Sequence, residues 1–178
     1  KYFVTITDLK GCTALDSVIV NVNPIPIVDF DVNGTCDGDF TGFTDLTTIN
    51  TGTILSWSWD FGDGVGTSSL QTAAYQYQNP GTYSVKLIVT SILGCIDSLT
   101  KDVTVNALPL TDAGTDQNIC LNDSLFLGGN PTGPIGSIYS WSPAISLSDV
   151  TVANPKAKPL STISYYLSVT DVNGCINY

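Results

Sequence analysis

A recurring pattern of aromatic residues and cysteines constrains this chain more than any other feature. Three stretches resemble one another: YFVTITDLKGC (2–12), YSVKLIVTSILGC (83–95) and YYLSVTDVNGC (165–175). The cysteines that end them, Cys12, Cys95 and Cys175, are nearly evenly spaced, and a second series, Cys36 and Cys120, has almost the same spacing. Trp59 and Trp141 precede the next Tyr-led stretch by identical intervals. This shared spacing indicates a tandem array with a period of about 80 residues.

The phase of the repeat divides the chain into three parts. Residues 1–23 are predicted to be the C-terminal strands of an upstream repeat. Residues 24–106, which begin within the linker NPIP, form one full copy, and residues 107–178 form a further copy that lacks its last strand. We therefore expect the chain to be a window on a longer polypeptide.

Strands rather than helices are predicted throughout. In LSWSWDF, one face carries Leu55, Trp57, Trp59 and Phe61, and the other carries Ser and Asp. A period of two is typical of a half-buried strand. It recurs with the inward set Tyr83, Val85, Leu87 and Val89. The central copy is predicted to have strands near 26–32, 40–47, 54–61, 72–78, 82–90 and 96–105.

Glycines mark the expected hairpin tips at LKG (9–11), LG (93–94) and VNG (172–174), where they supply a positive φ. Six or seven short strands per copy, with an inward Trp on the third, predict an immunoglobulin-like sandwich. The predicted fold class is all-β, with tandem β-sandwich domains arranged end to end.

Composition removes several kinds of chemistry. The chain has no His, Arg or Glu, so it cannot build a Ser-His-Asp arrangement or a His-containing zinc site. The net charge of −10 disfavours a nucleic-acid or anionic membrane partner. No apolar run approaches the length of a spanning helix, so direct membrane insertion is not expected. Because these residue types are missing, the sequence predicts a protein that is not an enzyme. Its five Cys include no CxxC pair, which favours disulfides in an oxidising compartment.

The most distinctive motif is WDFGDG, which comprises Trp59, Asp60, Phe61, Gly62, Asp63 and Gly64. In one interpretation it is the end of a core strand followed by a turn, whose N–H groups the two Asp side chains cap while the two Gly take positive φ. An alternative is a Ca²⁺ site built from Asp60, Asp63 and a loop oxygen. A catalytic Asp pair is disfavoured, because no cleft accompanies the two carboxylates.

WDFGDG followed by YQNPGTYSVKLIV (77–89) closely resembles the signature of PKD domains over about residues 26–106. The third copy, with YSWSPAISLSD (139–149) and YYLSVTDVNGC, looks like the related Ig-like repeats of Bacteroidota surface proteins. It lacks WDFGDG, so no Asp role is carried over to it. The alternation of such copies is similar to giant gliding-motility adhesins of the SprB kind.

This resemblance implies a PKD-type β-sandwich, export by type IX secretion, and display as long filaments on the cell surface. It also implies a lack of catalysis, and some PKD modules bind Ca²⁺. We expect no other cofactor. The expected partners are neighbouring repeats of the same chain, surface polysaccharide and other cell-surface proteins.

The cysteines allow two pairings. If each copy closes its own bridge, the pairs are Cys36–Cys95 and Cys120–Cys175, and Cys12 has an upstream partner. This is the preferred prediction. In an immunoglobulin-like topology, however, the loop before the second strand and the later hairpin tip lie at opposite ends. Cys36 would then be bonded to the hairpin of a neighbouring copy; free buried thiols are a third interpretation.

Two functions follow from these patterns. The first is a non-catalytic stalk or adhesive segment of a large surface protein for attachment or gliding, because each added repeat extends its reach. The second is an accessory carbohydrate-binding module of a secreted polysaccharide-degrading enzyme, which would stack sugars on exposed aromatic rings. Its candidate rings are Tyr75, Tyr77, Tyr139 and Tyr166.

One modification is also predicted. Asp-Ser-apolar triplets place Ser17, Ser98 and Ser124 in sites similar to those of Bacteroidota O-glycosylation. The alternative is that Asp-Ser begins a strand.

Overall fold

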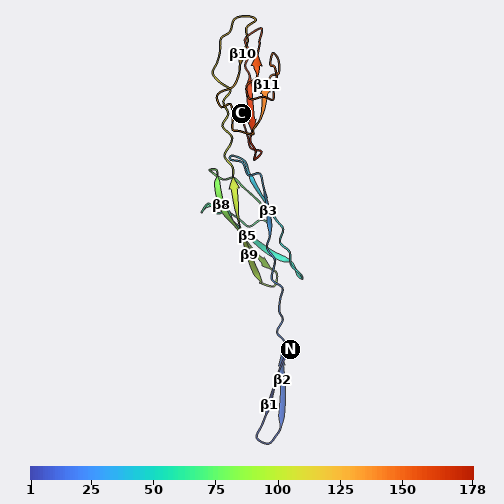
Figure 1. The fold of residues 1–178 in the computed structure, drawn as a ribbon. Helices are drawn as coiled ribbons and strands as arrows, with labels where there is room; N and C mark the ends of the chain where they lie inside the picture. Colours follow the sequence, from blue (N-terminus) through green and yellow to red (C-terminus); the bar gives the residue numbers. More distant parts are fainter.

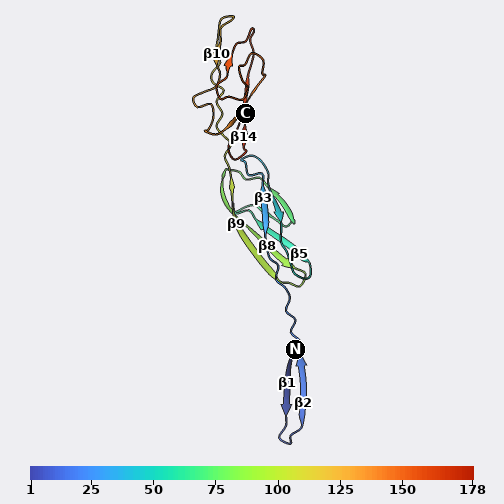
Figure 2. The same cartoon turned by 45° about the vertical axis from the view of Figure 1, so that its right-hand side comes forward.

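The chain forms three β-rich units in a row. The computed structural model describes residues 1–178, which contain strands, turns and loops and no helix. Figures 1 and 2 both show a hairpin at one end, a sandwich in the middle and a second β-unit at the other end. The predicted all-β class, with immunoglobulin-like sandwich units end to end, is confirmed. None of the elements is a helix of the length and apolarity needed to cross a membrane.

The N-terminal unit is a hairpin of β1 (Tyr2–Thr7) and β2 (Thr13–Val18). Its ladder runs from the pair Tyr2 and Val18 to the pair Thr7 and Thr13. Every residue of both strands is exposed, because the hairpin makes a two-stranded sheet by itself. The alternation expected for this stretch therefore forms a strand whose faces are both uncovered.

Two antiparallel sheets build the central unit. One has the order β3 (Phe30–Asn33), β4 (Thr41–Asp45), β7 (Thr72–Tyr75). The other has the order β6 (Thr67–Ser68), β5 (Ile54–Asp60), β8 (Gly81–Ser91), β9 (Ile96–Val105). Each of the six predicted strands is present, within a few residues. The pattern missed β6, because a two-residue strand has no periodicity to detect.

The core lies between these sheets. Val85, Leu87 and Val89 of β8 are fully buried, as their alternation predicts. Trp59 lies beside them on β5 of the same sheet, and its ring meets rings of the opposite sheet: that of Phe30 edge-on at 5.2 Å and that of Phe43 at 5.7 Å. Twelve buried side chains form this cluster, which is enough for a sandwich core of its own.

Leu55 is a correction to the predicted inward face. It is 61% exposed, because the pairing of β5 with β8 shifts register between Ile54 and Ser56. An irregularity of this kind interrupts the alternation of the strand. Ile54 packs against the core in place of Leu55.

The third unit repeats this plan with a smaller core. Its sheets are β11 (Ile138–Ser142), β13 (Tyr166–Thr170), β14 (Ile176–Asn177) and the pair β10 (Leu125–Phe126) with β12 (Lys156–Ala157). The buried cluster has three members, among them Trp141. The indole N–H of Trp141 donates to the Val152 carbonyl at 3.1 Å, as that of Trp59 donates to Leu70 at 2.8 Å. The acceptor stands at the same distance along the sequence from the Trp in both units, so this anchor recurs with the repeat.

Candidate functional site

The WDFGDG segment is a capped turn at the end of β5. One Asp60 carboxylate oxygen accepts the Gly62 N–H at 2.9 Å. One Asp63 oxygen accepts the N–H groups of Val65 and Gly66 at 3.0 and 2.7 Å. Gly62 and Gly64 have φ of +79° and +81°. The turn interpretation, with Asp caps and left-handed glycines, is thereby confirmed.

The two glycines differ in what surrounds them. A Cβ added to Gly62 would lie 2.6 Å from the Ser84 carbonyl oxygen and 2.8 Å from the Ser84 backbone nitrogen. A Cβ added to Gly64 would meet open space. Gly62 therefore has a packing requirement in addition to its backbone conformation, because the turn lies directly against β8.

A second contact holds the turn to the opposite sheet. The Tyr75 hydroxyl donates to the other Asp63 oxygen, and the Tyr75 ring stacks on Phe61 at 4.4 Å. Partial burial acts to raise the pKa of the Asp63 carboxyl, but the hydrogen bonds from Tyr75, Gly66 and Val65 outweigh it and hold that pKa below its usual value. The same hydrogen bond to Asp63 raises the pKa of the Tyr75 hydroxyl. The pair therefore favours ionised Asp63 with neutral Tyr75.

These bonds leave few oxygens for a cation. Both Asp63 oxygens and one Asp60 oxygen already accept hydrogen bonds. The structure contains no group of three or more acidic, His or Cys side chains that would hold a metal. Ca²⁺ takes six to eight oxygen ligands. These residues do not fit that requirement, so we assign Asp60 and Asp63 to the turn and derive no function through a metal.

The candidate sugar-stacking tyrosines divide between two units. Tyr77 is 4% exposed and its hydroxyl donates to the Phe61 carbonyl at 3.0 Å, so its ring belongs to the core. Burial, helped by the charge on Asp63, raises the pKa of the Tyr77 hydroxyl. Tyr75 and Tyr139 are half-buried, and Tyr166 is exposed. Tyr77 is therefore excluded as a sugar platform, because its ring is inaccessible.

The junction between the central and third units is closed by a disulfide. Cys36 is bonded to Cys175, with 5.5 Å between their Cα atoms and a sequence separation of 139. Residues Thr35–Asp37 lie beside Asn106, the last residue of the central unit. The backbone of Cys36 pairs with that of Asn106 in an isolated parallel β-bridge, and the Asp37 N–H donates to the Asn106 carbonyl at 2.8 Å. Cys36 therefore lies at the end of the central unit that faces the next one.

This bond corrects the preferred cysteine pairing. Cys36 does not join Cys95, and Cys120 does not join Cys175; Cys12, Cys95 and Cys120 are free. The reason is that the loop that carries Cys36 and the hairpin tip that carries Cys95 are far apart in the central unit. The Cys95 sulfur lies 3.9 Å from the Asn23 carbonyl oxygen, at the opposite end of the sandwich from Asn106 and Cys36. The upstream partner predicted for Cys12 stays a prediction.

The hairpin tips that present the cysteines share one geometry. In each, the residue four before the cysteine accepts the Cys N–H through its side-chain oxygen, at 2.8, 3.1 and 2.9 Å. The three pairs are Asp8 and Cys12, Ser91 and Cys95, and Asp171 and Cys175. The predicted tip glycines, Gly11, Gly94 and Gly174, all have positive φ. Sequence patterns thus predicted the tips but not their partners.

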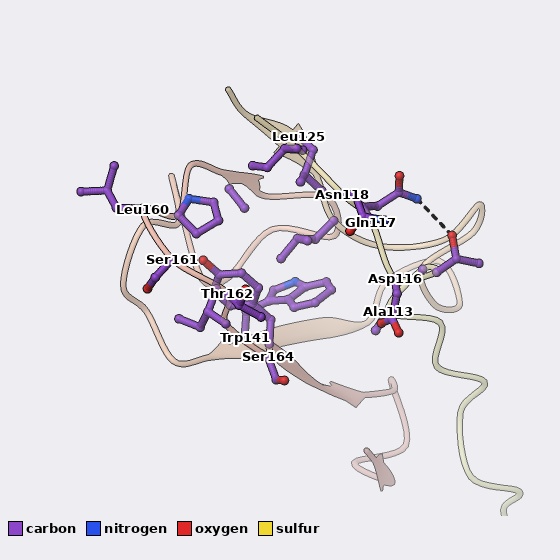
Figure 3. Close-up of a pocket in the computed structure, with 18 of the residues that line it drawn as sticks. Ala113, Asp116, Gln117, Asn118, Leu125, Trp141, Leu160, Ser161, Thr162 and Ser164 are labelled. Carbon is purple, nitrogen blue, oxygen red and sulfur yellow. Dashed lines mark hydrogen bonds between the residues drawn. The ribbon is translucent and has the colours of Figure 1, made fainter. Parts of the chain in front are cut away.

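A cavity of about 620 Å³ in the third unit had no signal in the sequence. Figure 3 shows it between the segments 113–121 and 159–165, with Trp141 and Leu125 among its lining residues. Its titratable lining side chains are Asp116, Cys120 and Tyr165. Burial raises the pKa of the Tyr165 hydroxyl, which donates to the Ile145 carbonyl at 3.1 Å. The lining offers apolar contact and no catalytic pair.

The predicted O-glycosylation sites all lie at exposed positions. Ser17 is in β2, Ser98 is in β9 and Ser124 directly precedes β10. Their modification stays a prediction.

Comparisons with known proteins find similarity over the central unit. Residues 21–107 match the family model described as PKD domain. The chain is 32% identical over 116 residues to a microbial collagenase of Vibrio alginolyticus, a match that covers 65% of this chain and 14% of the collagenase. It is 28% identical to the solved PKD1 domains of Vibrio anguillarum Epp and the Vibrio cholerae metalloprotease PrtV, with TM-scores of 0.45 and 0.40; each covers 48% of this chain and 99% of that domain.

The tight approach of the turn to β8 predicts different costs for two similar substitutions. Gly64→Ala is expected to cost about 1–2 kcal/mol, the penalty of a left-handed alanine. Gly62→Ala is expected to cost about 1–3 kcal/mol more, because its methyl group overlaps the Ser84 backbone. Urea unfolding followed by circular dichroism measures both. Equal costs would contradict the packing role of Gly62.

The lowered pKa of Asp63 predicts an acid-dependent contribution to stability. Its folded pKa lies below the unfolded value of about 3.9, so the contribution is present above that pH and is lost as pH falls through the folded pKa. Asp63→Asn keeps an acceptor oxygen but removes the charge, and is expected to cost about 1 kcal/mol at pH 7 and less below pH 3.

Tyr75→Phe supplies the control for this pair. If the hydroxyl bond to Asp63 carries the effect, the double variant is less destabilised than the sum of the two single variants. Urea titrations at pH 7 and pH 3 measure this. Additive costs at pH 7 would show that Asp63 acts on the turn alone.

Proposed function

We propose that this chain is a non-catalytic, load-bearing segment of a secreted or cell-surface protein, in which β-sandwich units form a stalk. The observation that carries the proposal is the Cys36–Cys175 bond, which crosses the junction between two sandwiches. A bond inside one unit would stabilise that unit alone. A bond between two units adds a second covalent connection across the junction, beside the backbone linker, which suits a structure that transmits force.

The arrangement of the units supports this role. Figures 1 and 2 show the units end to end, so each adds length. A second contact ties the third unit to the linker, since the Asn177 side-chain amide donates to the Pro109 carbonyl at 2.9 Å. PKD domains occur in secreted and surface proteins, and disulfides persist in oxidising surroundings. We therefore propose an extracellular or cell-surface location.

The finer proposal is an adhesin stalk for attachment or gliding, exported by type IX secretion. It rests on the likeness of the repeated sequence motifs to gliding-motility adhesins. The partners we propose are neighbouring repeats of the same chain, surface polysaccharide and other cell-surface proteins. The charge of −10 favours solvation of a long exposed stalk and repulsion between parallel copies.

A second candidate is an accessory module of a secreted enzyme. The sequence likeness to a microbial collagenase favours it. Because this relative is named as a collagenase, the candidate is an accessory to protein degradation rather than to the polysaccharide degradation first expected. The chain spans only 14% of the collagenase, so any collagen-related role is part of the proposal.

The stalk proposal predicts the response to pulling on the two chain ends. The bond excludes 139 residues from extension, about 490 Å of chain at ~3.5 Å per residue. The oxidised chain is expected to release only the short segments outside the bond. Cys36→Ser is expected to add steps that together release this excluded length, whereas the free-cysteine variant Cys120→Ser should behave as the unchanged chain. Single-molecule force spectroscopy measures this, and long steps in the oxidised chain would contradict a load-bearing junction.

The accessory-module candidate makes a separate prediction. If the chain serves a collagenase-like enzyme, it should sediment with insoluble collagen fibrils. Sedimentation at physiological salt measures this, with bovine serum albumin as the unrelated control. A chain that stays in the supernatant would leave the stalk as the supported function.

A further inference from the structure

We propose that a disulfide between units, here called the staple, recurs at each junction of the array, and that Cys36–Cys175 is one instance of it. Each staple joins a cysteine in the loop at the end of one unit, as Cys36 is, to a cysteine at the hairpin tip of the next unit, as Cys175 is. Cys95 then bonds to the loop cysteine of a preceding β-sandwich unit, and Cys120 bonds to the hairpin-tip cysteine of a following one. This inference rests on the proposed stalk function and specifies how its units are joined. The partner in each case is a second unit of the same kind.

The hairpin half of the staple is already built at Cys95. Its N–H bonds to the Ser91 side chain, as that of Cys175 bonds to Asp171. The N–H of Ser91 also donates to the Cys95 carbonyl at 2.8 Å, and that of Asp171 donates to Cys175 at 2.9 Å. Cys95 therefore has the same backbone setting as the cysteine that is bonded across the junction.

The loop half is built at Cys120. The Cys36 carbonyl accepts an N–H from the residue three positions later at 3.1 Å, and the Cys120 carbonyl does so at 3.0 Å. Each turn has a left-handed residue two positions after the cysteine: Gly38 with φ +82° and Asn122 with φ +75°. Cys120 is exposed and free, so its thiol is accessible to a partner.

A separate contact places Cys95 at a junction. Its sulfur lies 3.9 Å from the Asn23 carbonyl oxygen. Asn23 precedes Asn106 by one period of the repeat, and Asn106 is the residue beside which Cys36 lies. A preceding unit that ends at Asn23 as the central unit ends at Asn106 would bring its own cysteine loop to the Cys95 sulfur.

The chemistry is ordinary thiol–disulfide exchange. Two thiols form one S–S bond and release two protons and two electrons. The electrons pass to a disulfide oxidant of the export compartment, which is itself reduced to two thiols. The reaction needs the two sulfurs adjacent, as the folded units place those of Cys36 and Cys175.

The consequence is a short covalent route along the array. From Cys95 to Cys120 the backbone runs through only about 25 residues, roughly 90 Å when extended. A staple at Cys95 would connect this segment to the preceding unit, and a staple at Cys120 would connect it to the following unit. Tension that follows the staples bypasses most of every sandwich, so the units stay folded under load.

A lengthened chain tests this directly: residues 1–106 followed by residues 24–178, so that the central unit occurs twice. It contains seven cysteines, three from 1–106 and four from 24–178. The staple predicts that Cys36 of the first copy joins Cys95 of the second, and that Cys36 of the second joins Cys175. Three free thiols would remain. Thiol labelling under denaturing, non-reducing conditions, with intact mass, counts them.

The same substitution in the two identical copies supplies the matched control. Cys95→Ser in the first copy removes a free thiol, so the count falls from three to two and both bonds remain. Cys95→Ser in the second copy removes a staple and frees the first-copy Cys36, so the count rises to four. Five free thiols in the lengthened chain, or one, would overturn the proposal, since these counts correspond to a single staple and to bridges within each copy.

Failure of the staple is distinct from failure of the stalk. The pulling experiment on the 178-residue chain depends only on the Cys36–Cys175 bond. Five free thiols in the lengthened chain, together with the expected shielding of 139 residues in the shorter one, would leave the stalk in place without the recurring staple.

Discussion

The Trp59 ring is packed between the two sheets of the central unit, against Phe30 on β3 and Phe43 on β4. Burying an aromatic side chain of this size contributes about 2–3 kcal/mol, and the ring also holds the sheets in a fixed relation. Because the sandwich is held in this way, the Cys36 loop stays at one end and the Cys95 tip at the other. The junction chemistry therefore depends on a core that contains no cysteine.

That separation of ends explains why the bond forms between units. A loop at the far end of one sandwich meets the hairpin tip at the near end of the next. Cys36 lies beside Asn106, where the central unit ends, and the Cys175 tip folds back toward this linker, where Asn177 binds Pro109. Figure 2 shows β14 beside this junction. The β-sandwich topology thus places the two cysteines so that a disulfide cross-links neighbouring repeats.

Much of this was predictable from sequence. Alternation predicted β8 and β9 nearly to their ends, and the glycines predicted the hairpin tips. The partner of Cys36 was not, because both cysteine series repeat with almost the same period, so a shared period does not say whether Cys36 meets the hairpin tip of its own copy or that of the next; only the position of each loop decides it. The predicted inward position of Leu55 was wrong, because a register shift leaves no mark on a periodic pattern. The cavity of the third unit was not predicted, because it arises from loops whose paths the sequence does not specify.

The Cys36–Cys175 bond also reduces the size of the core that the third unit needs for its own stability. The third unit buries a cluster of three residues against twelve in the central unit, and a small core alone seldom stabilises a domain of this size. A bond that spans 139 residues restricts the unfolded chain, in the loop-entropy account by about 4–5 kcal/mol. Because that bond ends at Cys175 in the third unit, the well-packed sandwich stabilises its weaker neighbour. Units of unequal core size can then serve in one stalk, since the junction shares stability between them.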